Sequence, residues 1–262
     1  MATFVARHNQ NNRNLIEALS ITAGQTLNFR NLPTDEAAWA LLESEADLGL
    51  ISPLLFGKRQ SDIALLGGAC VAAVGATGEW RLHFRQGLHS IDTLGIYGTR
   101  GMSDMLAEIL LREKYGMQPR LHQVTGPAPQ ALAAVDAILT TSDEERTELD
   151  SSSSLDIIDE WFDMTQLPLV REVFIGWERR LDAIIDHAVR TAGEITDTEA
   201  LHTLKAAMQG RGTENETEAI PSHFRYVFND DAVEGLRTFF QMAFFYGLHP
   251  DIPDLLFWMA EE

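Results

Sequence analysis

The sequence predicts an α/β fold built mainly on parallel strands, and three observations support this. Short β-rich runs alternate along the chain with longer segments of helical periodicity. The chain has 262 residues, the length of one large domain or of two lobes. Hydrophobic residues make up 45% of it, which is enough for a core without disulfides or metals and too many for a disordered chain.

The runs expected to form strands are short and mostly apolar. They lie near residues 3–7, 26–29, 48–51, 71–74, 94–97, 120–124, 137–140 and 170–175. Residues 79–85 differ, because Trp80, Leu82 and Phe84 alternate with polar residues. That pattern predicts a strand with one solvated face, at a sheet edge or a crossover.

Helices are expected where apolar residues recur at helical spacing. One covers residues 103–116, with Glu108 and Arg112 spaced to pair across one turn. A second follows the apolar stripe from Trp177 to a stop at Gly193, which would make Trp177 a core residue of that helix.

The last expected helix covers residues 233–246, and Asp231 with Glu234 resembles a capping box at its start. Residues 140–154 are polar and acidic, and residues 210–218 contain no apolar side chain. Both segments are therefore expected to be surface connections.

The charge balance excludes several partners. Twenty Lys and Arg stand against 39 Asp and Glu, a net charge of −19. Nucleic acids and anionic membranes attract an excess of Lys and Arg, so neither is an expected partner. The longest apolar stretch, residues 63–76, is too short to span a membrane, and the first residues lack the apolar core of a signal peptide. A cytoplasmic protein is expected.

Sequence motifs for binding nucleotides or metals and for a nucleophilic serine are absent. The only cysteine, Cys70, cannot form an intramolecular disulfide or a Cys-rich zinc site, and its apolar surroundings predict a buried residue. The eight histidines are scattered, so no metal site is expected.

Ligands of parallel α/β sheets lie beyond the carboxyl ends of the strands, so the loops there are the candidate sites. The first loop contains Asn9, whose amide can donate and accept, with Arg7 and Arg13 able to hold a carboxylate. Alternatively, its asparagines only cap the next helix and shape turns. Ser52, in the second loop, either binds a ligand or opens the following helix.

The third loop, residues 98–103, is flanked by glycine and leads into a helix. Its backbone N–H groups and the helix dipole favour an anion, and Arg100 can add a charge-assisted hydrogen bond. Thr99 and Ser103 supply hydroxyl groups, although an N-cap role alone would also account for Ser103.

Four segments of the chain resemble segments of a known family. Residues 155–177, LDIIDEWFDMTQLPLVREVFIGW, resemble a segment of the menaquinone biosynthesis family of the futalosine pathway, particularly its chorismate dehydratase branch. Residues 47–53 (DLGLISP), 106–116 (LAEILLREKYG) and 224–248 (FRYVFNDDAVEGLRTFFQMAFFYGL) resemble further parts of that family in the same order, the last of them its final long helix. Together the matches extend over essentially the whole chain.

The resemblance implies a two-lobed fold similar to type II periplasmic binding proteins, with a ligand in the cleft between lobes. Residues 1–86 would form the first part of lobe I, residues 87–176 lobe II, and residues 177–262 the return to lobe I. The strand at residues 80–84 would then be one crossover between the lobes.

Site residues carry over one by one. Asn9, in VARHN, matches the family's substrate-contacting asparagine. Thr99 and Ser103 fall in its anion-binding turn, and Asp143 matches the aspartate of a Gly-Asp pair. Two departures concern the cleft: Leu82 stands where the family has a serine, and the residues from Gln10 replace Thr-Leu-Pro.

The implied activity is a carbon–oxygen lyase that removes water from chorismate to give 3-[(1-carboxyvinyl)oxy]benzoate, without metal or organic cofactor. Asn9 is the expected catalytic residue, because it would orient the substrate. The expected substrate-binding residues are Ser52, Thr99, Arg100, Ser103 and Asp143. His8 is the one candidate for a general base in these loops, with a solvent-facing turn residue as the alternative.

Two other functions stay open. The chain could be a noncatalytic cytoplasmic solute-binding or sensor protein for a small carboxylate, or the sister enzyme that acts on a futalosine-derived nucleoside. A small carboxylate ligand in the interlobe cleft is the expected partner, and a monomer or homodimer the expected state.

Overall fold

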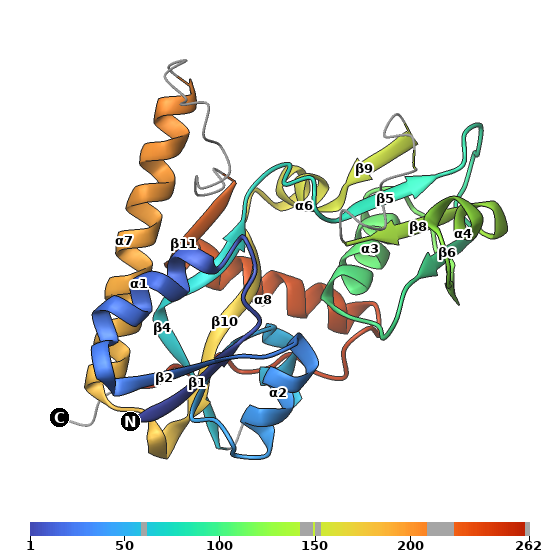
Figure 1. The fold of residues 1–262 in the computed structure, drawn as a ribbon. Helices are drawn as coiled ribbons and strands as arrows, with labels where there is room; N and C mark the ends of the chain where they lie inside the picture. Colours follow the sequence, from blue (N-terminus) through green and yellow to red (C-terminus); the bar gives the residue numbers. More distant parts are fainter. Residues whose placement is uncertain (59–61, 142–148, 150–152, 209–222, 260–262) are drawn as a thin grey trace. The chain divides into compact units, whose positions relative to one another are not determined.

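The computed structural model describes residues 1–58, 62–141, 149, 153–208 and 223–259. The chain divides into two units, each with one sheet (Figure 1). Unit 1 comprises Met1–Ala73, Val170–Arg237 and Asp251–Glu262, and unit 2 comprises Val74–Leu169 and Thr238–Pro250.

Unit 1 is built on a six-stranded sheet in the order β11-β4-β10-β3-β1-β2. Its strands are β1 (Ala2–Ala6), β2 (Leu27–Asn31), β3 (Leu48–Ile51), β4 (Ile63–Ala73), β10 (Leu169–Trp177) and β11 (Phe224–Phe228). β1 is parallel to β2 and β3, whereas β10 is antiparallel to β3 and β11 to β4. All four residues of β3 are buried, as its uninterrupted apolar run predicts for a covered sheet.

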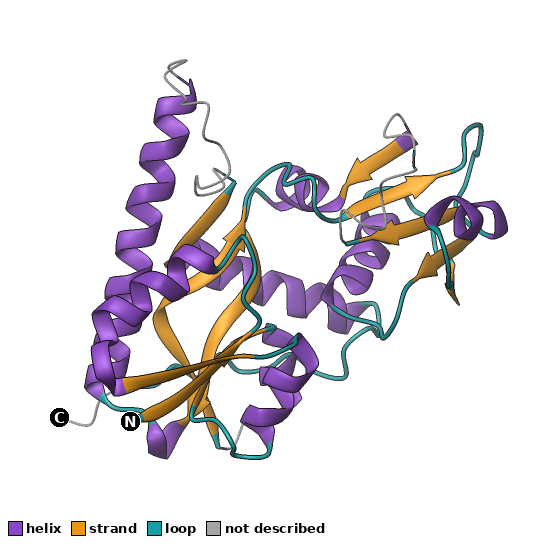
Figure 2. Cartoon of the chain, in the orientation of Figure 1, coloured by secondary structure: helices purple, strands orange, loops and turns teal. Residues whose placement is uncertain are grey.

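Helices accompany this sheet (Figure 2). They are α1 (Arg13–Ala23), α2 (Thr34–Leu42), α7 (Ala183–Met208) and the first part of α8 (Asp230–Phe245), with short 3₁₀ turns η1 (Gly24–Thr26), η2 (Pro53–Lys58) and η4 (Glu178–Arg180). α1 packs against α7, where the hydroxyl of Thr22 donates to the carbonyl oxygen of Ala188 at 3.1 Å.

The stripe predicted as one helix from Trp177 to Gly193 is divided in the structure, so that prediction was wrong. Trp177 ends β10, where its half-buried indole N–H donates to the carbonyl oxygen of Leu41 at 2.9 Å. Gly193 lies inside α7, where an added Cβ would stand 2.7 Å from the carbonyl oxygen of Gly68. The glycine is therefore a contact point between α7 and β4, and not a helix stop.

Unit 2 is built on a five-stranded sheet in the order β7-β6-β8-β5-β9. Its elements are β5 (Arg81–Phe84), β6 (Thr93–Ile96), β7 (Arg120–Gln123), β8 (Ala137–Thr140), β9 (Ser154–Asp156), α3 (Met102–Glu113), α4 (Ala128–Ala134) and α6 (Ile157–Thr165). β6 is parallel to β7 and β8. The fully buried Trp161 of α6 meets Phe239 of α8 edge-on, with ring centroids 6.4 Å apart.

β5 corrects the expectation of an edge or crossover strand with one wet face. It lies between β8 and β9 and is antiparallel to both, with Arg81 opposite Thr140 on one side and Asp156 on the other. Both Leu82 and His83 are buried, so the alternation in the sequence does not mark a solvated face.

The units also differ in extent from the lobes expected at residues 1–86, 87–176 and 177–262. Unit 2 begins at Val74, because β5 belongs to its sheet. Unit 1 resumes at Val170, because β10 pairs with β3. Residues 238–250 belong to unit 2, where the carbonyl oxygen of Tyr246 accepts a hydrogen bond from Arg112 at 3.0 Å.

Residues 224–248, which resembled one long helix, divide into a strand and a helix, and the helix α8 covers most of the one expected at residues 233–246. β11 precedes α8, whose start is capped by Asn229, since its Oδ1 accepts the N–H of Ala232 at 3.0 Å. Cys70 is fully buried, as expected. Among the described residues, no helix has both the length and the apolar character that crossing a membrane requires.

Candidate functional site

The loop between β1 and α1 lies at the carboxyl end of β1, and its asparagines shape it. Oδ1 of Asn9 accepts the backbone N–H groups of Asn11 at 2.8 Å and Asn12 at 3.1 Å. In return, the N–H of Asn9 donates to Oδ1 of Asn12 at 2.9 Å. These are the bonds of an Asx turn, so the turn-shaping role considered for the asparagines is present.

A carboxylate from β10 joins this loop. Nδ2 of Asn9 donates to Oε1 of Glu172 at 3.2 Å, and Nδ2 of Asn12 donates to Oε2 at 2.9 Å. The register between β10 and β3 pairs Val173 with Ile51, the last residue of β3. Glu172 therefore stands one residue further, at the carboxyl end of β3.

The two asparagine side chains have only one orientation that fits their neighbours, because each oxygen faces N–H donors and each nitrogen faces acceptors. Asn12 is 0% exposed, and its Nδ2 also donates to the carbonyl oxygen of Arg7 at 2.8 Å. Asn9 is half-buried, and its contact with that oxygen is longer, 3.5 Å. One amide proton of Asn9 thus goes to Glu172 and the other makes only this longer contact, which a ligand could replace, whereas its oxygen is occupied.

Ser52 follows β3 and forms the turn into η2. Its Oγ accepts the N–H of Leu54 at 3.4 Å, and its carbonyl oxygen accepts the N–H of Leu55 at 3.1 Å. The half-buried hydroxyl keeps its own proton for donation. Its contact with a ligand stays a prediction.

Other polar side chains flank the first loop. Arg7 and His8 are exposed, and the backbone N–H of His8 donates to Oδ1 of Asn31 at 2.9 Å. Arg13 lies 4.0 Å from Glu17 in an exposed pair on α1. The role of general base that the sequence analysis considered for His8 stays a prediction.

In unit 2 the loop after β6 leads into α3, and the carboxyl group of Asp104 lies at the N-terminus of this helix. Oδ2 of Asp104 accepts the N–H of Gly101 at 2.7 Å. Asp104 is 6% exposed, and burial raises its pKa, an effect that the N–H of Gly101 partly opposes. Thr99 is exposed and Ser103 half-buried beside this carboxyl group, and their role in binding an anion stays a prediction.

Arg100 is held by a buried carboxylate. Its guanidinium donates to Glu108, which is 3% exposed and whose second oxygen lies 3.3 Å from Nη2 of Arg112. The pairing predicted between Glu108 and Arg112 is thereby confirmed. Arg100 compensates a buried charge, a role that sequence reasoning did not assign to it.

Two residues outside the expected set enter the candidate sites. Glu172 carries a charge within the otherwise largely apolar strand 169–177, which is the signal that could have found it. Arg81 is half-buried on β5, where the sequence suggested a solvated face. Asp143 lies outside the described residues, and among those that are described no cluster of His, Cys, Asp and Glu could hold a metal ion.

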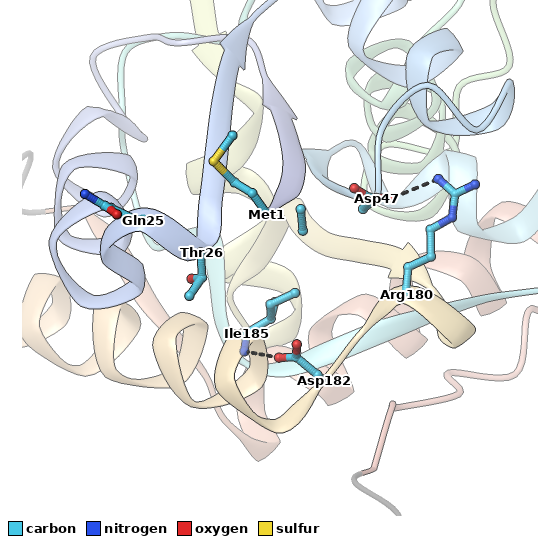
Figure 3. A pocket seen from close by; sticks show the side chains of 8 residues that line it. Met1, Gln25, Thr26, Asp47, Arg180, Asp182 and Ile185 are labelled. Carbon is cyan, nitrogen blue, oxygen red and sulfur yellow. Dashed lines mark hydrogen bonds and ion pairs between the residues drawn. The ribbon is translucent and has the colours of Figure 1, made fainter.

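Unit 1 also contains an open pocket at the opposite end of its strands, with a volume of about 460 Å³ (Figure 3). It is lined by Met1, Ala2, Gln25, Thr26, Asp47, Arg180, Asp182 and Ile185. Arg180 is paired with Asp47 at 2.8 Å, and Asp182 accepts the N–H of Ile185 at 2.8 Å (Figure 3). The charged groups of this pocket thus have partners in the chain.

The fold is that of periplasmic binding proteins. The chain is similar to the periplasmic aliphatic sulphonate binding protein SsuA of Escherichia coli, with a TM-score of 0.61 and 13% identity over 100% of this chain and 92% of the other. A Candida albicans protein, the CA3427 gene product, described as having the generic periplasmic binding protein fold, gives a TM-score of 0.60 and 10% identity over 100% and 98% of the two chains.

A third structure, protein AF1704 of Archaeoglobus fulgidus, gives a TM-score of 0.57 and 16% identity over 94% of this chain and 97% of that one. No curated protein matches the sequence. The model of a family described as menaquinone biosynthesis matches residues 10–244, which include nearly every element of both units. The chain therefore belongs to the menaquinone biosynthesis family, which ties it to the formation of menaquinone.

Proposed function

We propose that the protein is a chorismate dehydratase. The reaction breaks one C–H bond of the substrate ring, and its electron pair forms a new ring double bond while the neighbouring hydroxyl leaves. The released proton and hydroxide make water, and the product is 3-[(1-carboxyvinyl)oxy]benzoate. The reaction needs no oxidant or reductant, so its demands are the orientation of two carboxylates and the exclusion of water.

The observation that carries this proposal is the hydrogen-bonded group of Asn9, Asn12 and Glu172 in a member of this family. Glu172 accepts hydrogen bonds from the side-chain amides of both asparagines and so fixes the orientation of Asn9 at the carboxyl ends of β1 and β3. The second amide proton of Asn9, which makes only a 3.5 Å contact, can then turn to a ligand. A donor held in one place suits an oxygen of the substrate better than a freely rotating amide does.

The remaining roles follow from donor chemistry. The hydroxyls of Ser52 in unit 1 and of Thr99 and Ser103 in unit 2 would bind the carboxylates of the substrate. Anion binding by this fold has a precedent in the Escherichia coli neighbour, an aliphatic sulphonate binding protein. Cytoplasmic action is part of the same proposal.

The test is incubation of the purified protein with chorismate, followed by mass spectrometry. A product lighter by one water is expected, and it should be absent without protein. Unchanged chorismate would contradict the proposal. Product formation at the wild-type rate by Asn9→Ala would contradict the role of Asn9.

A second candidate is a noncatalytic binding or sensor protein for a small carboxylate, which the binding-protein fold of the neighbours favours. Calorimetric binding of chorismate without any loss of water would support it against the dehydratase. Turnover of a futalosine-derived nucleoside, with chorismate left intact, would instead identify the sister enzyme.

A further inference from the structure

Arg81 is a half-buried cation that has no carboxylate partner among the described residues. Within the part of the chain that the structure describes, its side chain makes one hydrogen bond, from Nη2 to Oγ of Ser154 at 2.5 Å, and its buried Nε has no acceptor. Arg100 and Arg112, in the same unit, both contact Glu108. An uncompensated arginine is unexpected in a chain whose net charge is −19.

The acidic residue opposite Arg81 does not neutralise it. Asp156 faces Arg81 in the register of β5 and β9, but its carboxylate is directed at the backbone. One oxygen accepts the N–H of Gly78 at 2.5 Å, and the other accepts those of Ile158 at 3.0 Å and Asp159 at 3.2 Å. Asp156 therefore serves as the N-cap of α6 and leaves the guanidinium to another anion.

Arg81 also lies where this type of sheet binds ligands. It is opposite Thr140, the last residue of β8, and β8 is parallel to β6. The buried Thr140 fixes this end of β5, because its hydroxyl lies 3.4 Å from the carbonyl oxygen of Arg81 and 3.2 Å from Nε2 of His83. Ligands of α/β sheets lie beyond such carboxyl ends.

We propose that Arg81 is an anion-binding residue of unit 2 that takes a carboxylate of a small organic acid. The planar guanidinium can hold a carboxylate through two parallel N–H donors, which a lysine cannot do. The identity of the acid, chorismate with its two carboxylates, rests on the proposed function, whereas the anion chemistry does not. Arg81 would thereby have the anion-binding role that the sequence analysis assigned to Arg100. The guanidinium of Arg100 is already paired with Glu108.

The test compares Arg81→Gln with Arg120→Gln by titration calorimetry. Arg120 is an exposed arginine of β7 in the same unit, so both variants lose one positive charge there. The ligands are isophthalate, an unreactive aromatic dicarboxylate, and benzoate, its monocarboxylate analogue. The wild-type protein is expected to bind isophthalate more tightly than benzoate. Arg81→Gln should weaken isophthalate binding about 10- to 100-fold and remove that preference, as loss of a charge-assisted hydrogen bond predicts.

Arg120→Gln should stay within about twofold of the wild type. Unchanged isophthalate affinity in Arg81→Gln, or no binding of either ligand by the wild type, would overturn the proposal. If the circular dichroism spectrum shows that Arg81→Gln is not folded, the test uses Arg81→Lys in its place. This variant keeps the positive charge and loses the two-point contact with a carboxylate. A loss of about fivefold or more in isophthalate affinity supports the proposal, and an unchanged affinity overturns it.

Chorismate turnover separates this proposal from the proposed function. Arg81-dependent binding of isophthalate by a protein that leaves chorismate intact would refute the dehydratase and retain the anion site. Turnover of chorismate with the same KM in the wild type and Arg81→Gln would retain the dehydratase and refute the anion site.

Discussion

Glu172 accepts a hydrogen bond from the buried amide of Asn12 at 2.9 Å, although the two residues are 160 positions apart in the chain. The same carboxylate accepts the amide of Asn9 at 3.2 Å. A charge on β10 thus joins the bonds within the loop after β1 in holding its conformation. The loop is held in place by the chain itself, so a ligand that binds there need not order it.

The coupling of Glu172 to Asn9 can be measured in a double-mutant cycle. Glu172→Gln keeps one acceptor oxygen and puts an NH2 group in place of the other, so one of the two asparagine amides would face a donor and the orientation of Asn9 would be disturbed. We expect Asn9→Ala and Glu172→Gln each to lower kcat for chorismate about 10- to 100-fold. The double variant should be no slower than Asn9→Ala, because the two changes remove one function.

The control for this cycle is Glu178→Gln, which removes the same charge from an exposed position in η4. It should leave kcat within about twofold of the wild type. Losses that multiply in the double variant would show that Glu172 does not act through Asn9. Glu172→Asp keeps the acceptor, and partial recovery of kcat would distinguish positioning from a general loss of structure.

Much of the fold could be predicted from the sequence because its core strands carry their signal locally. β3 and β8 are short apolar runs, and each is buried along its whole length with the bounds that the sequence predicted. The stripe from Trp177 to Gly193 shows where this reasoning fails. Apolar residues at the end of a strand continued the spacing of the helix that follows, so two elements had the pattern of one.

The candidate site was predictable only in part, for a different reason. The loops of Asn9 and Ser52 follow strands, and their polar residues are visible in the sequence. The role of Glu172 depends on partners more than 150 positions away in the chain. The role of Arg81 depends on the fact that Asp156 accepts backbone N–H groups and does not pair with the guanidinium. No local pattern contains this information.

Glu108 is expected to be the main electrostatic contribution to the stability of α3. Glu108→Ala would leave the guanidinium groups of Arg100 and Arg112 close together without their shared carboxylate, at a cost of about 3 kcal/mol in the free energy of unfolding. The exposed pair of Glu234 and Arg237, 2.6 Å apart, provides the control. Glu234→Ala should cost about 0.5 kcal/mol or less in urea denaturation, and equal losses would contradict the role of burial.

Asp104 predicts a pH dependence of stability with a definite sign. Burial raises its pKa, so between the pKa of an unfolded aspartate, about 4, and the raised value, the folded chain binds more protons than the unfolded one. Its contribution to stability therefore falls as the pH rises through that range. Asp104→Asn keeps an oxygen for the N–H of Gly101 and cannot ionise.

We therefore expect Asp104→Asn to gain stability relative to the wild type between about pH 4 and pH 7, measured by urea denaturation at both values. The matched control is Asp35→Asn, which changes an exposed aspartate in the first turn of α2. Curves for the wild type and Asp104→Asn that run parallel across this range would contradict the prediction.

Gly193 tests the contact between α7 and β4, because two effects of its replacement by alanine oppose each other. In an exposed helix, Gly→Ala stabilises by about 1 kcal/mol. Here the added Cβ would stand 2.7 Å from the carbonyl oxygen of Gly68, 2.8 Å from Cβ of Ala69 and 3.0 Å from the carbonyl oxygen of Tyr226. Two of these atoms are backbone atoms of paired strands and cannot yield as a side chain does. Overpacking should therefore dominate and lower the free energy of unfolding by about 1–3 kcal/mol, whereas Thr198→Ala on the exposed part of α7 should change it by about 0.5 kcal/mol or less. A Gly193→Ala protein more stable than the wild type would show that α7 is not held against β4 at this point.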